Sequence, residues 1–309
     1  NYSTYNGTTS NMPDNNARVL EVFRRSNSII FQRSLCLDGT TYTRYTTDGG
    51  TTWSAWEGLA LNSKIANLDY ANAGAHNSIY RGKNLGSSVT AAQWAAIGNG
   101  TFDDLYIGDY WTINEVNWRI AAFDYWFLLG DSRTNTHHVV IVPDDNLVIV
   151  AMNSTKSTDG AYTGSDFYTG ANDNSGKSTM MSAINNAFGS THILTHRELL
   201  SKTVTDGYVS AVEWHDSTAE LMSERMVFGT NIYGSILHGT NKPALYEIDN
   251  IQLPLFRFDM VHSVTSIQHF WLRDVATSTQ FVCRGINGTV FEQDCDSNKG
   301  IRPAFGITA

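Results

Sequence analysis

Histidine is the side chain best suited to metal binding or proton transfer near neutral pH, and the chain has nine of them. His137 and His138 stand directly before an apolar run at residues 139–142, His196 stands at the start of a predicted helix, and His215 lies near acidic residues. Their spacing matches no known set of metal ligands. We therefore expect the histidines to be surface or hydrogen-bonded structural residues, without catalytic roles.

The three cysteines, Cys36, Cys283 and Cys295, are too few for a disulfide framework and leave one over. We expect folding not to depend on them. Cys283 and Cys295 could still pair if two adjacent loops bring them together.

Two further patterns come close to ligand-binding motifs and fail on spacing. Residues 170–178 have a glycine-rich phosphate-loop composition, but five residues separate Gly170 from Gly176 where four are required, so they predict a solvated loop before a helix. Asp294, Asp296 and Asn298 have the rhythm of a calcium loop, although its glycine comes one place late and its glutamate is missing. An exposed polar turn is the alternative to a cation there, and we expect no cofactor.

Residues 46–53 fit the Asp-box pattern (S/T)-x-D-x-G-x-T-W, which sialidases repeat around a propeller. Here the box occurs once, whereas a propeller needs several repeats. In such a box the aspartate bonds backbone N–H groups and the tryptophan packs beneath. The pattern therefore predicts a stabilised hairpin turn without a catalytic role.

The C-terminal stretch, residues 270–307, encloses a polar middle between two apolar ends that each carry an arginine. Its ends contain Trp271 with Arg273, and Arg302 within the sequence GIRPAF, a composition typical of strands that bury one face. Its middle, residues 276–299, mixes small polar, acidic, aromatic and cysteine side chains around two glycines, which favours turns and exposed surface. This organisation is typical of a scaffold that presents a binding surface.

This stretch resembles the C-terminal end of C-type lectin-like domains related to formylglycine-generating enzymes. The resemblance lies in three successive features, namely the sequence WLR, a strand with a glycine turn, and the sequence GIRPAF. Such domains occur in phage tail proteins and in the variable proteins of diversity-generating retroelements. The resemblance spans residues 102–307 and implies an α+β fold. The triplets of calcium-dependent sugar-binding lectins are absent, and the two cysteines do not match the tighter pair of formylglycine-generating enzymes, which leaves a redox or copper function as a weaker alternative.

The same resemblance implies a receptor-binding face within residues 276–298 and a supporting core around it. The expected ligand-binding residues are Ala276, Ser278, Thr279, Phe281, Arg284, Asn287, Phe291, Asp294 and Asp296. The expected structural support comes from Trp111, Trp118, Trp271, Arg273 and Arg302, with Phe305 also in the core. The resemblance further implies that a retroelement diversifies residues 276–298. Most residue types there can arise from an AAC codon by mutation of adenine, although Glu292 and Gln293 cannot.

We divide the whole chain into three parts. These are a small antiparallel β module at residues 1–58, a linker with a short helix at 59–100, and a C-type lectin-like α+β domain at 101–309. Alternating strand patterns support the module, whose short motifs resemble the trimeric knob modules of phage and pyocin tail fibres. Thr90 and Gln93 form a capping box before the helix at 91–97. Residues 110–121 predict a hairpin with its turn at Asn114 and Glu115, and residues 177–189, 195–202 and 219–228 are predicted helices.

Charge and hydropathy argue against two classes of partner, nucleic acids and membranes. A formal net charge of −9 with interspersed lysines and arginines disfavours nucleic-acid or anionic-membrane partners, which would call for a basic face. No apolar run approaches the roughly 20 residues that span a bilayer. Because Asn1 is not an initiator methionine, we expect the chain to start inside a longer protein.

Within these limits, the two resemblances imply a phage or prophage tail-tip protein, located in the virion tail and acting outside the host cell. We expect a homotrimer that contacts other tail proteins and binds a bacterial surface receptor, either glycan or protein, without enzyme activity. Two alternatives remain open. One is a glycan-depolymerising tailspike with two carboxylates about 5 or 6.5–9.5 Å apart. The other is a purely structural tail component in which residues 276–299 are buried against another subunit.

Overall fold

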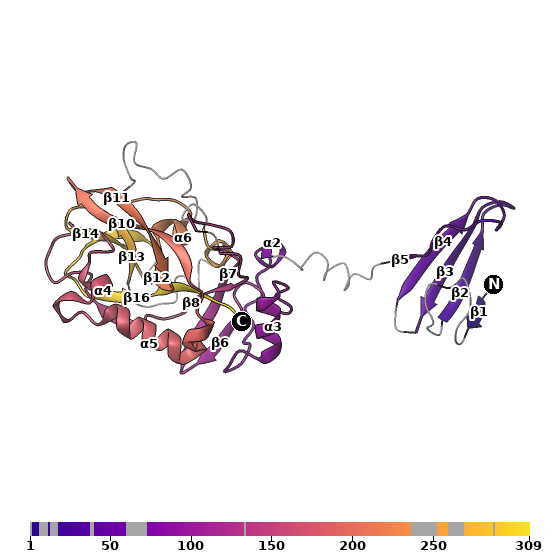
Figure 1. Ribbon diagram of the computed structural model, residues 1–309, viewed down its shortest axis with the longest axis horizontal. Coiled ribbons are helices and arrows are strands. Elements are labelled where there is room, and N and C mark those ends of the chain that lie inside the picture. The colour runs from indigo at the N-terminus through magenta and orange to yellow at the C-terminus, as the bar shows by residue number, and fades with distance from the viewer. Residues whose placement is uncertain are drawn as a thin grey trace. The chain divides into compact units, whose positions relative to one another are not determined.

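The structure is a computed structural model that describes residues 2–5, 12, 18–37, 40–59, 73–132, 134–235, 252–258, 269–286 and 288–309. The chain forms two compact units, Asn1–Asp69 and Tyr70–Ala309 (Figure 1).

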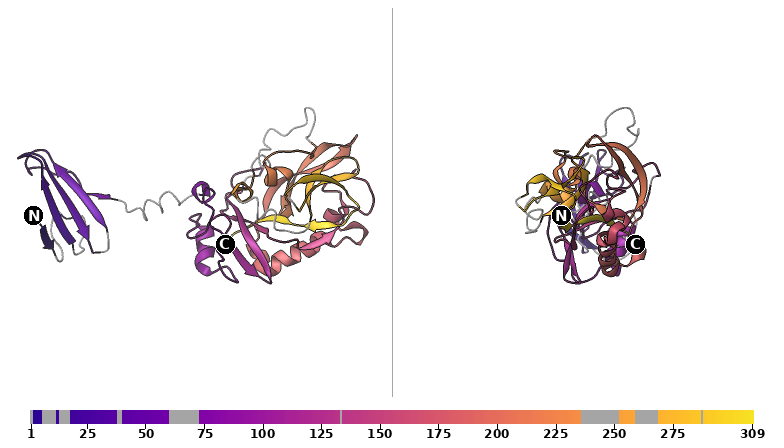
Figure 2. Two further views of the ribbon diagram at one scale, coloured as in Figure 1. Left: turned by 180° about the vertical axis from the view of Figure 1, so that it is seen from behind. Right: turned by 90° about the vertical axis from the view of Figure 1, so that its left-hand side faces the viewer.

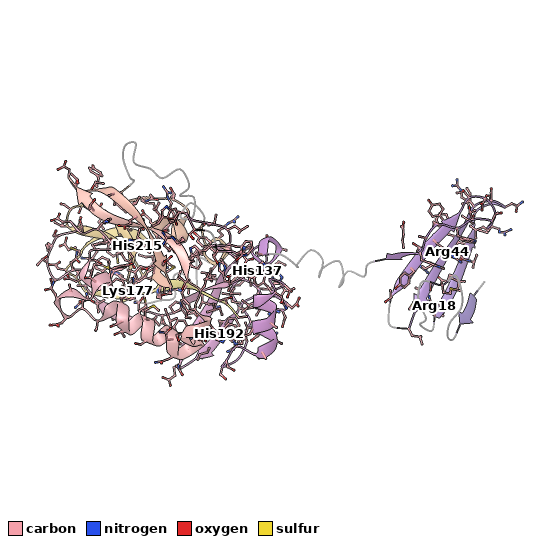
Figure 3. All side chains as sticks on the ribbon, in the orientation of Figure 1. Arg18, Arg44, His137, Lys177, His192 and His215 are labelled. Atoms are coloured by element: carbon pink, nitrogen blue, oxygen red, sulfur yellow. The ribbon has the colours of Figure 1, made fainter. Side chains whose placement is uncertain are left out.

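The described part of the N-terminal unit contains a five-stranded sheet whose strands follow one another in chain order, all antiparallel. The strands are β1 (Tyr2–Tyr5), β2 (Arg18–Arg24), β3 (Ile30–Cys36), β4 (Thr41–Thr46) and β5 (Glu57–Leu59). One face buries Leu20 and Ile30, and on it the Arg44 guanidinium lies 4.7 Å from the ring centre of Trp53 and 4.3 Å from that of Trp56. Arg44 lies in this sheet in Figure 3. The predicted antiparallel β structure is confirmed.

The Asp-box sequence forms the turn after β4. The backbone N–H of Thr52 donates to the Asp48 carboxylate at 3.0 Å, and the hydroxyl of Thr46 donates to the same carboxylate at 2.6 Å. The indole N–H of Trp53 donates to the carbonyl of Gly50 at 3.2 Å. These bonds, the largest of them from Thr46 and Thr52, lower the pKa of Asp48. The geometry agrees with the structural interpretation of this motif.

The described residues of the C-terminal unit form two five-stranded sheets and a long hairpin. The first sheet has the order β12-β17-β8-β7-β6, and every neighbouring pair in it is antiparallel. Its strands are β6 (Tyr110–Ile113), β7 (Val116–Phe123), β8 (Val139–Pro143), β12 (Ala219–Leu221) and β17 (Pro303–Ile307). The predicted hairpin is β6–β7, and its turn residues Asn114 and Glu115 have φ values of 52° and 66°, the left-handed conformation that two-residue hairpin turns require.

The second sheet has the order β15-β14-β13-β16-β9 and combines antiparallel pairs with one parallel pair, β13 with β16. Its strands are β9 (Val148–Val150), β13 (Phe270–Val275), β14 (Gln280–Arg284), β15 (Val290–Asp294) and β16 (Lys299–Ile301). The hairpin consists of β10 (His196–Thr205) and β11 (Tyr208–Ser217).

Helices are short apart from α5, which runs along one side of the C-terminal unit (Figure 1). The described helices are α2 (Ala73–His76), α3 (Ala91–Gly98), α4 (Asp166–Thr169), α5 (Gly176–Phe188), α6 (Glu224–Phe228) and α7 (Pro254–Phe258), with 3-10 turns η1 (Ala171–Asp173) and η2 (Ser190–His192). The predicted capping box is confirmed, because Gln93 N–H donates to the Thr90 hydroxyl at 3.2 Å and Thr90 N–H donates to the Gln93 side chain at 2.9 Å. The C-terminus lies beside α3, as Figure 2 shows from behind, and a Cβ at Gly98 would stand 2.7 Å from that of Ala309.

Aromatic rings join α5 to the first sheet. The ring centre of Phe188, the last residue of α5, lies 5.5 Å from that of Trp118 and 5.6 Å from that of Phe305, with interplanar angles of 77° and 61°. Edge-to-face packing of this kind adds stabilisation beyond the burial of apolar area. Trp111 and Trp271 are fully buried as well, so the four aromatic residues expected in the core all lie there.

The predicted α+β C-type lectin-like fold is wrong. Strands make up 37% of the structure and helices 18%, and the sheets curl as part of a barrel, which describes a mainly β protein. Of residues 195–202, which were predicted as a helix, 196–202 belong to β10. The predicted helix at 219–228 begins as strand β12 and becomes helical only at Glu224. The predicted helix at 177–189 agrees with α5.

The segment that forms β10 was predicted as a helix because polar residues are among those it buries. His196, Glu198 and Leu200 alternate with more exposed neighbours and point inward, but two of these three are polar, so the alternation was not visible as a hydrophobic pattern. Glu198 is tied to an arginine on β13, because its carboxylate lies 2.9 Å from the Arg273 guanidinium and 3.2 Å from His196 Nε2. A tertiary ion pair therefore makes an inward glutamate compatible with the strand.

Residues 73–100, expected to be the second part of a linker, belong to the folded C-terminal unit. His76 is buried and its Nδ1 lies 2.7 Å from the carbonyl oxygen of Leu105, while Ile97 of α3 is fully buried. The side chain of Asn77 both donates to and accepts from the backbone of Phe123.

The buried Glu198–Arg273 pair gives a stability prediction. Arg273→Met leaves the Glu198 carboxylate buried without its guanidinium, so we expect the free energy of unfolding at pH 7 to fall by about 3–5 kcal/mol, measured by urea denaturation. Lys202→Met, which removes the cation of an exposed pair with Glu213 on the same hairpin, should leave it nearly unchanged. Equal losses in the two variants would contradict the prediction.

The same pair predicts how the free energy of unfolding changes at acidic pH. Burial acts to raise the pKa of Glu198, but Arg273 and His196 outweigh burial and lower this pKa from 4.5 to about 2. A lowered folded-state pKa contributes stability that is present above pH 4.5 and is lost as the pH falls toward 2. The difference in unfolding free energy between wild type and Arg273→Met should therefore shrink across that interval. A constant difference would contradict this assignment.

Candidate functional site

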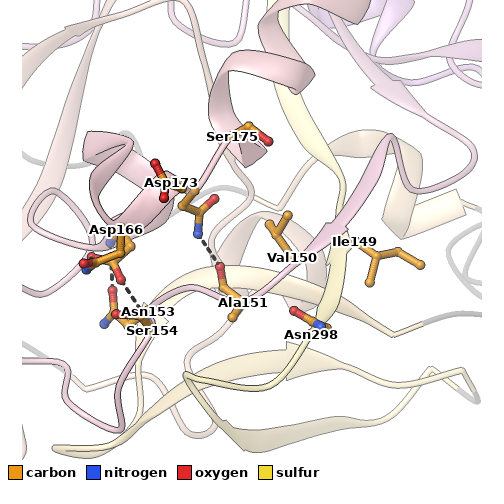
Figure 4. A pocket seen from close by; sticks show the side chains of 11 residues that line it. Ile149, Val150, Ala151, Asn153, Ser154, Asp166, Asp173, Ser175 and Asn298 are labelled. Carbon is orange, nitrogen blue, oxygen red and sulfur yellow. Dashed lines mark hydrogen bonds between the residues drawn. The ribbon is translucent and has the colours of Figure 1, made fainter.

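An open hollow of about 260 Å³ lies in the C-terminal unit where several loops meet (Figure 4). Ile149 and Val150 from β9 form its apolar part. The polar part comes from the loop after β9, the start of α4, the loop before α5 and the turn after β15. The polar lining residues are Asn153, Ser154, Asp166, Asn172, Asp173, Asn174, Ser175 and Asn298.

Asp166 organises the hollow. Its carboxylate accepts the backbone N–H of Ser154 at 2.6 Å and the side-chain amide of Asn172 at 3.0 Å, while its own N–H donates to the side chain of Asn153 at 2.8 Å. Partial burial acts to raise the pKa of Asp166, but the hydrogen bonds from Ser154 and Asn172 outweigh it, and the pKa is lowered. Asp166 is therefore an ionised group that holds two loops together.

The loop before α5 is held in a strained conformation at the edge of the hollow. Asn172 and Asp173 have φ values of 51° and 59°, the left-handed region that costs most residues about 1 kcal/mol or more and that Asn and Asp tolerate best. The side chain of Asn174 donates to the carbonyl of Ala151 at 2.9 Å and accepts the N–H of Gly176 at 3.0 Å, which fixes this loop beside β9. Retained strain of this kind is characteristic of binding loops.

Three side chains of the hollow remain available to a ligand. Within the described part of the chain, Asp173, Ser175 and Asn298 make no side-chain hydrogen bond to protein, and they line the hollow together with Ile149, which is 52% exposed. A carboxylate, a hydroxyl and an amide offer donors and acceptors, and Ile149 offers an apolar contact. This combination suits a hydroxylated ligand with an apolar face.

The segment predicted to bind the receptor is only partly exposed. Phe281 and Arg284 are buried, since the ring of Phe281 packs 6.4 Å from that of Trp271 and the Arg284 guanidinium lies 5.5 Å from the ring centre of Phe270. The expectation that these two side chains face a ligand was therefore wrong. Of the other predicted residues, Ser278 and Asp296 are exposed, Ala276, Thr279, Phe291 and Asp294 are half-buried, and Asn287 lies outside the described residues.

The exposed predicted residues lie on turns that meet two other loops, and we call this surface, residues 153–159, 205–208, 277–279 and 294–298, the loop face. The hydroxyl of Thr158 donates to the carbonyl of Thr277 at 2.7 Å, and Lys156 Nζ lies 2.5 Å from the Asp294 carboxylate. The tip of the β10–β11 hairpin approaches Ser278 and carries Tyr208, which is 55% exposed. Asn298 belongs to both the loop face and the hollow.

The sequence interpretation missed most of the hollow. Residues 170–178 were recognised only as a failed phosphate loop, yet four of them line the hollow. The signal that was available is the run of consecutive small polar residues, Asn172 to Ser175, directly before a helix. Ile149 and Asp166 gave no signal, because their roles depend on loops from distant parts of the chain.

The structure shows the contacts made by the residues of the suggested cation site and by the cysteines. Asp294 is engaged by Lys156 and by the side chain of Gln280, and the hydrogen bond from Lys156 is the main cause of its lowered pKa. Among the described residues, no group of three His, Cys, Asp or Glu side chains is placed to hold a metal. All three cysteines are free and buried, and Cys295 donates to the carbonyl of Thr155 at 3.2 Å.

The histidines of Figure 3 are spread over the C-terminal unit and make structural contacts. His137 Nδ1 lies 2.7 Å from the Asp124 carboxylate and its ring stacks on Phe127. His192 Nδ1 lies 2.9 Å from the carbonyl oxygen of Thr308, and its ring stacks on Trp94 at 4.1 Å.

Comparison of the chain with protein-family models, curated proteins and solved structures finds no match in any of the three. Across the described ranges, no helix has the length and apolar character needed to cross a membrane. The site must therefore be interpreted from its own geometry.

The burial of the cysteines predicts their reactivity. Burial raises the pKa of Cys283 to about 12 and also raises that of Cys295, so both remain thiols at neutral pH and are poor nucleophiles. We expect negligible labelling by a maleimide in the native protein and full labelling of three thiols in denaturant, measured by mass spectrometry. A disulfide between Cys283 and Cys295 in non-reducing peptide maps would contradict this.

Proposed function

We propose that the chain is a receptor-binding protein of a phage tail that acts outside the host cell and binds a glycan of the bacterial surface. The observation that carries the proposal is the hollow, in which Asp173, Ser175 and Asn298 offer uncommitted polar groups beside the exposed Ile149. The adjoining loop face supplies further exposed contacts, including Ser278, Asp296 and Tyr208. The phage setting rests on the resemblance of the N-terminal sequence to tail-fibre modules.

The chemistry of the hollow favours a sugar over other small ligands. Sugar hydroxyls both donate and accept, so one hydroxyl can donate to the Asp173 carboxylate while a neighbour bonds both ends of the Asn298 amide. The C–H face of a sugar ring is apolar and fits against Ile149. The hollow is open to solvent, which allows a terminal sugar of a larger glycan to enter while the rest extends over the loop face.

A binding role is better supported than glycan hydrolysis. A hydrolase needs one carboxylic acid with a raised pKa to protonate the leaving oxygen. Asp166 has a lowered pKa and its carboxylate already accepts bonds from Ser154 and Asn172. It therefore holds loops in place and is a poor proton donor.

Binding to host envelope glycans tests the proposal. We expect Asp173→Ala and Asn298→Ala each to weaken binding at least tenfold on an array of bacterial surface polysaccharides, because each removes a polar partner from the hollow. Asp216→Ala serves as the matched control, since this aspartate is exposed on β11 away from the hollow lining. Unchanged binding in both hollow variants, together with loss of binding in Asp216→Ala, would contradict the proposed site.

Trimeric assembly is part of the same proposal, because several copies strengthen weak single contacts through multivalency. On the N-terminal sheet, Phe23, Phe31 and Tyr45 are directly paired across β2, β3 and β4, and they are 53%, 47% and 50% exposed. A row of exposed aromatic residues favours contact with other protein surfaces, either further copies or other tail proteins.

Light scattering at micromolar concentration tests the assembly. We expect a trimer for the wild type and dissociation in Phe31→Glu, because the new charge would be buried in the contact. Ala55→Glu, at an exposed position outside the row, should remain trimeric. A stable wild-type monomer would contradict trimeric assembly without bearing on the hollow.

A further inference from the structure

Arg302 is fully buried at the junction of β16 and β17, and its guanidinium is only partly satisfied. Its Nε donates to the carbonyl of Pro143 at 2.6 Å. Both terminal nitrogens, Nη1 and Nη2, are buried and have no hydrogen-bond partner among the residues that the structure describes. Burial lowers the pKa of Arg302 only to about 10, so the group carries its charge at neutral pH.

The surroundings of Arg302 are rich in positive charge. Arg284 from β14 is also fully buried, and the two guanidinium groups lie 5.3 and 5.5 Å from the ring centre of Phe270. The described charged groups that act on Arg302 are Arg119, Arg284, Asp144 and Asp145. Asp144 is already paired with Arg119 at 2.5 Å, and Asp145 is exposed.

A buried guanidinium with two unused nitrogens is costly, because a charge removed from water is tolerated only when it is paired and hydrogen-bonded. The Phe270 ring attracts both cations, but an N–H contact with a ring is weak and does not replace the hydrogen bonds that two guanidinium nitrogens would make to water or to an anion. A water molecule would accept those hydrogen bonds and leave the charge. A monatomic anion would accept the same bonds and also balance the charge.

We infer that Nη1 and Nη2 of Arg302 bind a small inorganic anion of halide size, beside Phe270 and Arg284. A halide is favoured over phosphate or sulfate because the group is buried within packed strands, where a single-atom acceptor fits more readily than a tetrahedral one. The anion would fix the junction at which the chain passes from the second sheet to the first. The site is independent of the glycan-binding hollow.

Chloride-dependent stability tests the inference. The melting temperature of the wild type should rise with chloride concentration when gluconate keeps the ionic strength constant, since a ligand that binds only the folded state stabilises it by mass action. Arg302→Met removes the need for an anion, so its melting temperature should not depend on chloride. Lys202→Met, which removes an exposed positive charge, should keep the wild-type dependence.

A crystal of the unmodified protein soaked in bromide gives a second measurement that does not require the variant to fold. We expect an anomalous peak within hydrogen-bond distance of Nη1 and Nη2 of Arg302. A melting temperature that is indifferent to chloride, an equal dependence in Arg302→Met, or ordinary water density with no anomalous signal at this position would each overturn the inference. Loss of glycan binding in variants of the hollow would leave it unaffected.

Discussion

The C-terminal unit depends on the way residues 299–307 connect its two sheets. Lys299–Ile301 pairs with β9 and β13 in the second sheet, and Pro303–Ile307 then pairs with β12 and β8 in the first. Only Arg302 stands between these strands, so the two sheets cannot move independently. Gly300 of β16 lies so close to Asn146 that an added Cβ would stand 1.9 Å from the side-chain nitrogen of Asn146.

This connection also places the candidate site. Because β9 pairs with β16, the loop that follows β9 begins at a fixed edge of the second sheet, where Asp166 and Asn174 hold it against the start of α4 and the loop before α5. The hollow thus has a rigid floor of strand residues and walls made of loops. Binding loops on a rigid scaffold can vary in sequence without loss of the fold.

Buried polar groups connect elements that are far apart in the chain. Glu198 joins β10 to β13 through Arg273, and Glu220 on β12 accepts hydrogen bonds from Tyr162 and from Lys177 of α5. Replacing one member of such a pair leaves the other uncompensated in the interior, which makes these positions more sensitive than their polar character suggests. These contacts specify which helix and hairpin pack on which strand.

The sequence by itself determined those elements whose signals are local. The Thr90–Gln93 capping box, the Asn114–Glu115 turn, the Asp-box turn at 46–53, helix α5 and the aromatic core around Trp118 all depend on neighbouring residues or on one apolar face, and the structure contains each of them. The apolar strands that contain Trp271 and Phe305 were also recognised from composition.

Tertiary structure decided the fold class, the exposure of residues 276–299 and the candidate site. The motifs WLR and GIRPAF were sufficient to indicate strands. They could not indicate which sheet each strand joins, because strand pairing depends on residues far apart in the chain. Residues 196–200 looked helical because inward-facing His196 and Glu198 conceal a strand period. The burial of Glu198 is compensated by its ion pair with Arg273, and His196 in turn contacts Glu198. Phe281 and Arg284 are buried because Trp271 and Phe270, both on β13, pack against them. The hollow exists only where β9, α4 and the turn at Asn298 converge, and no window of sequence contains all three.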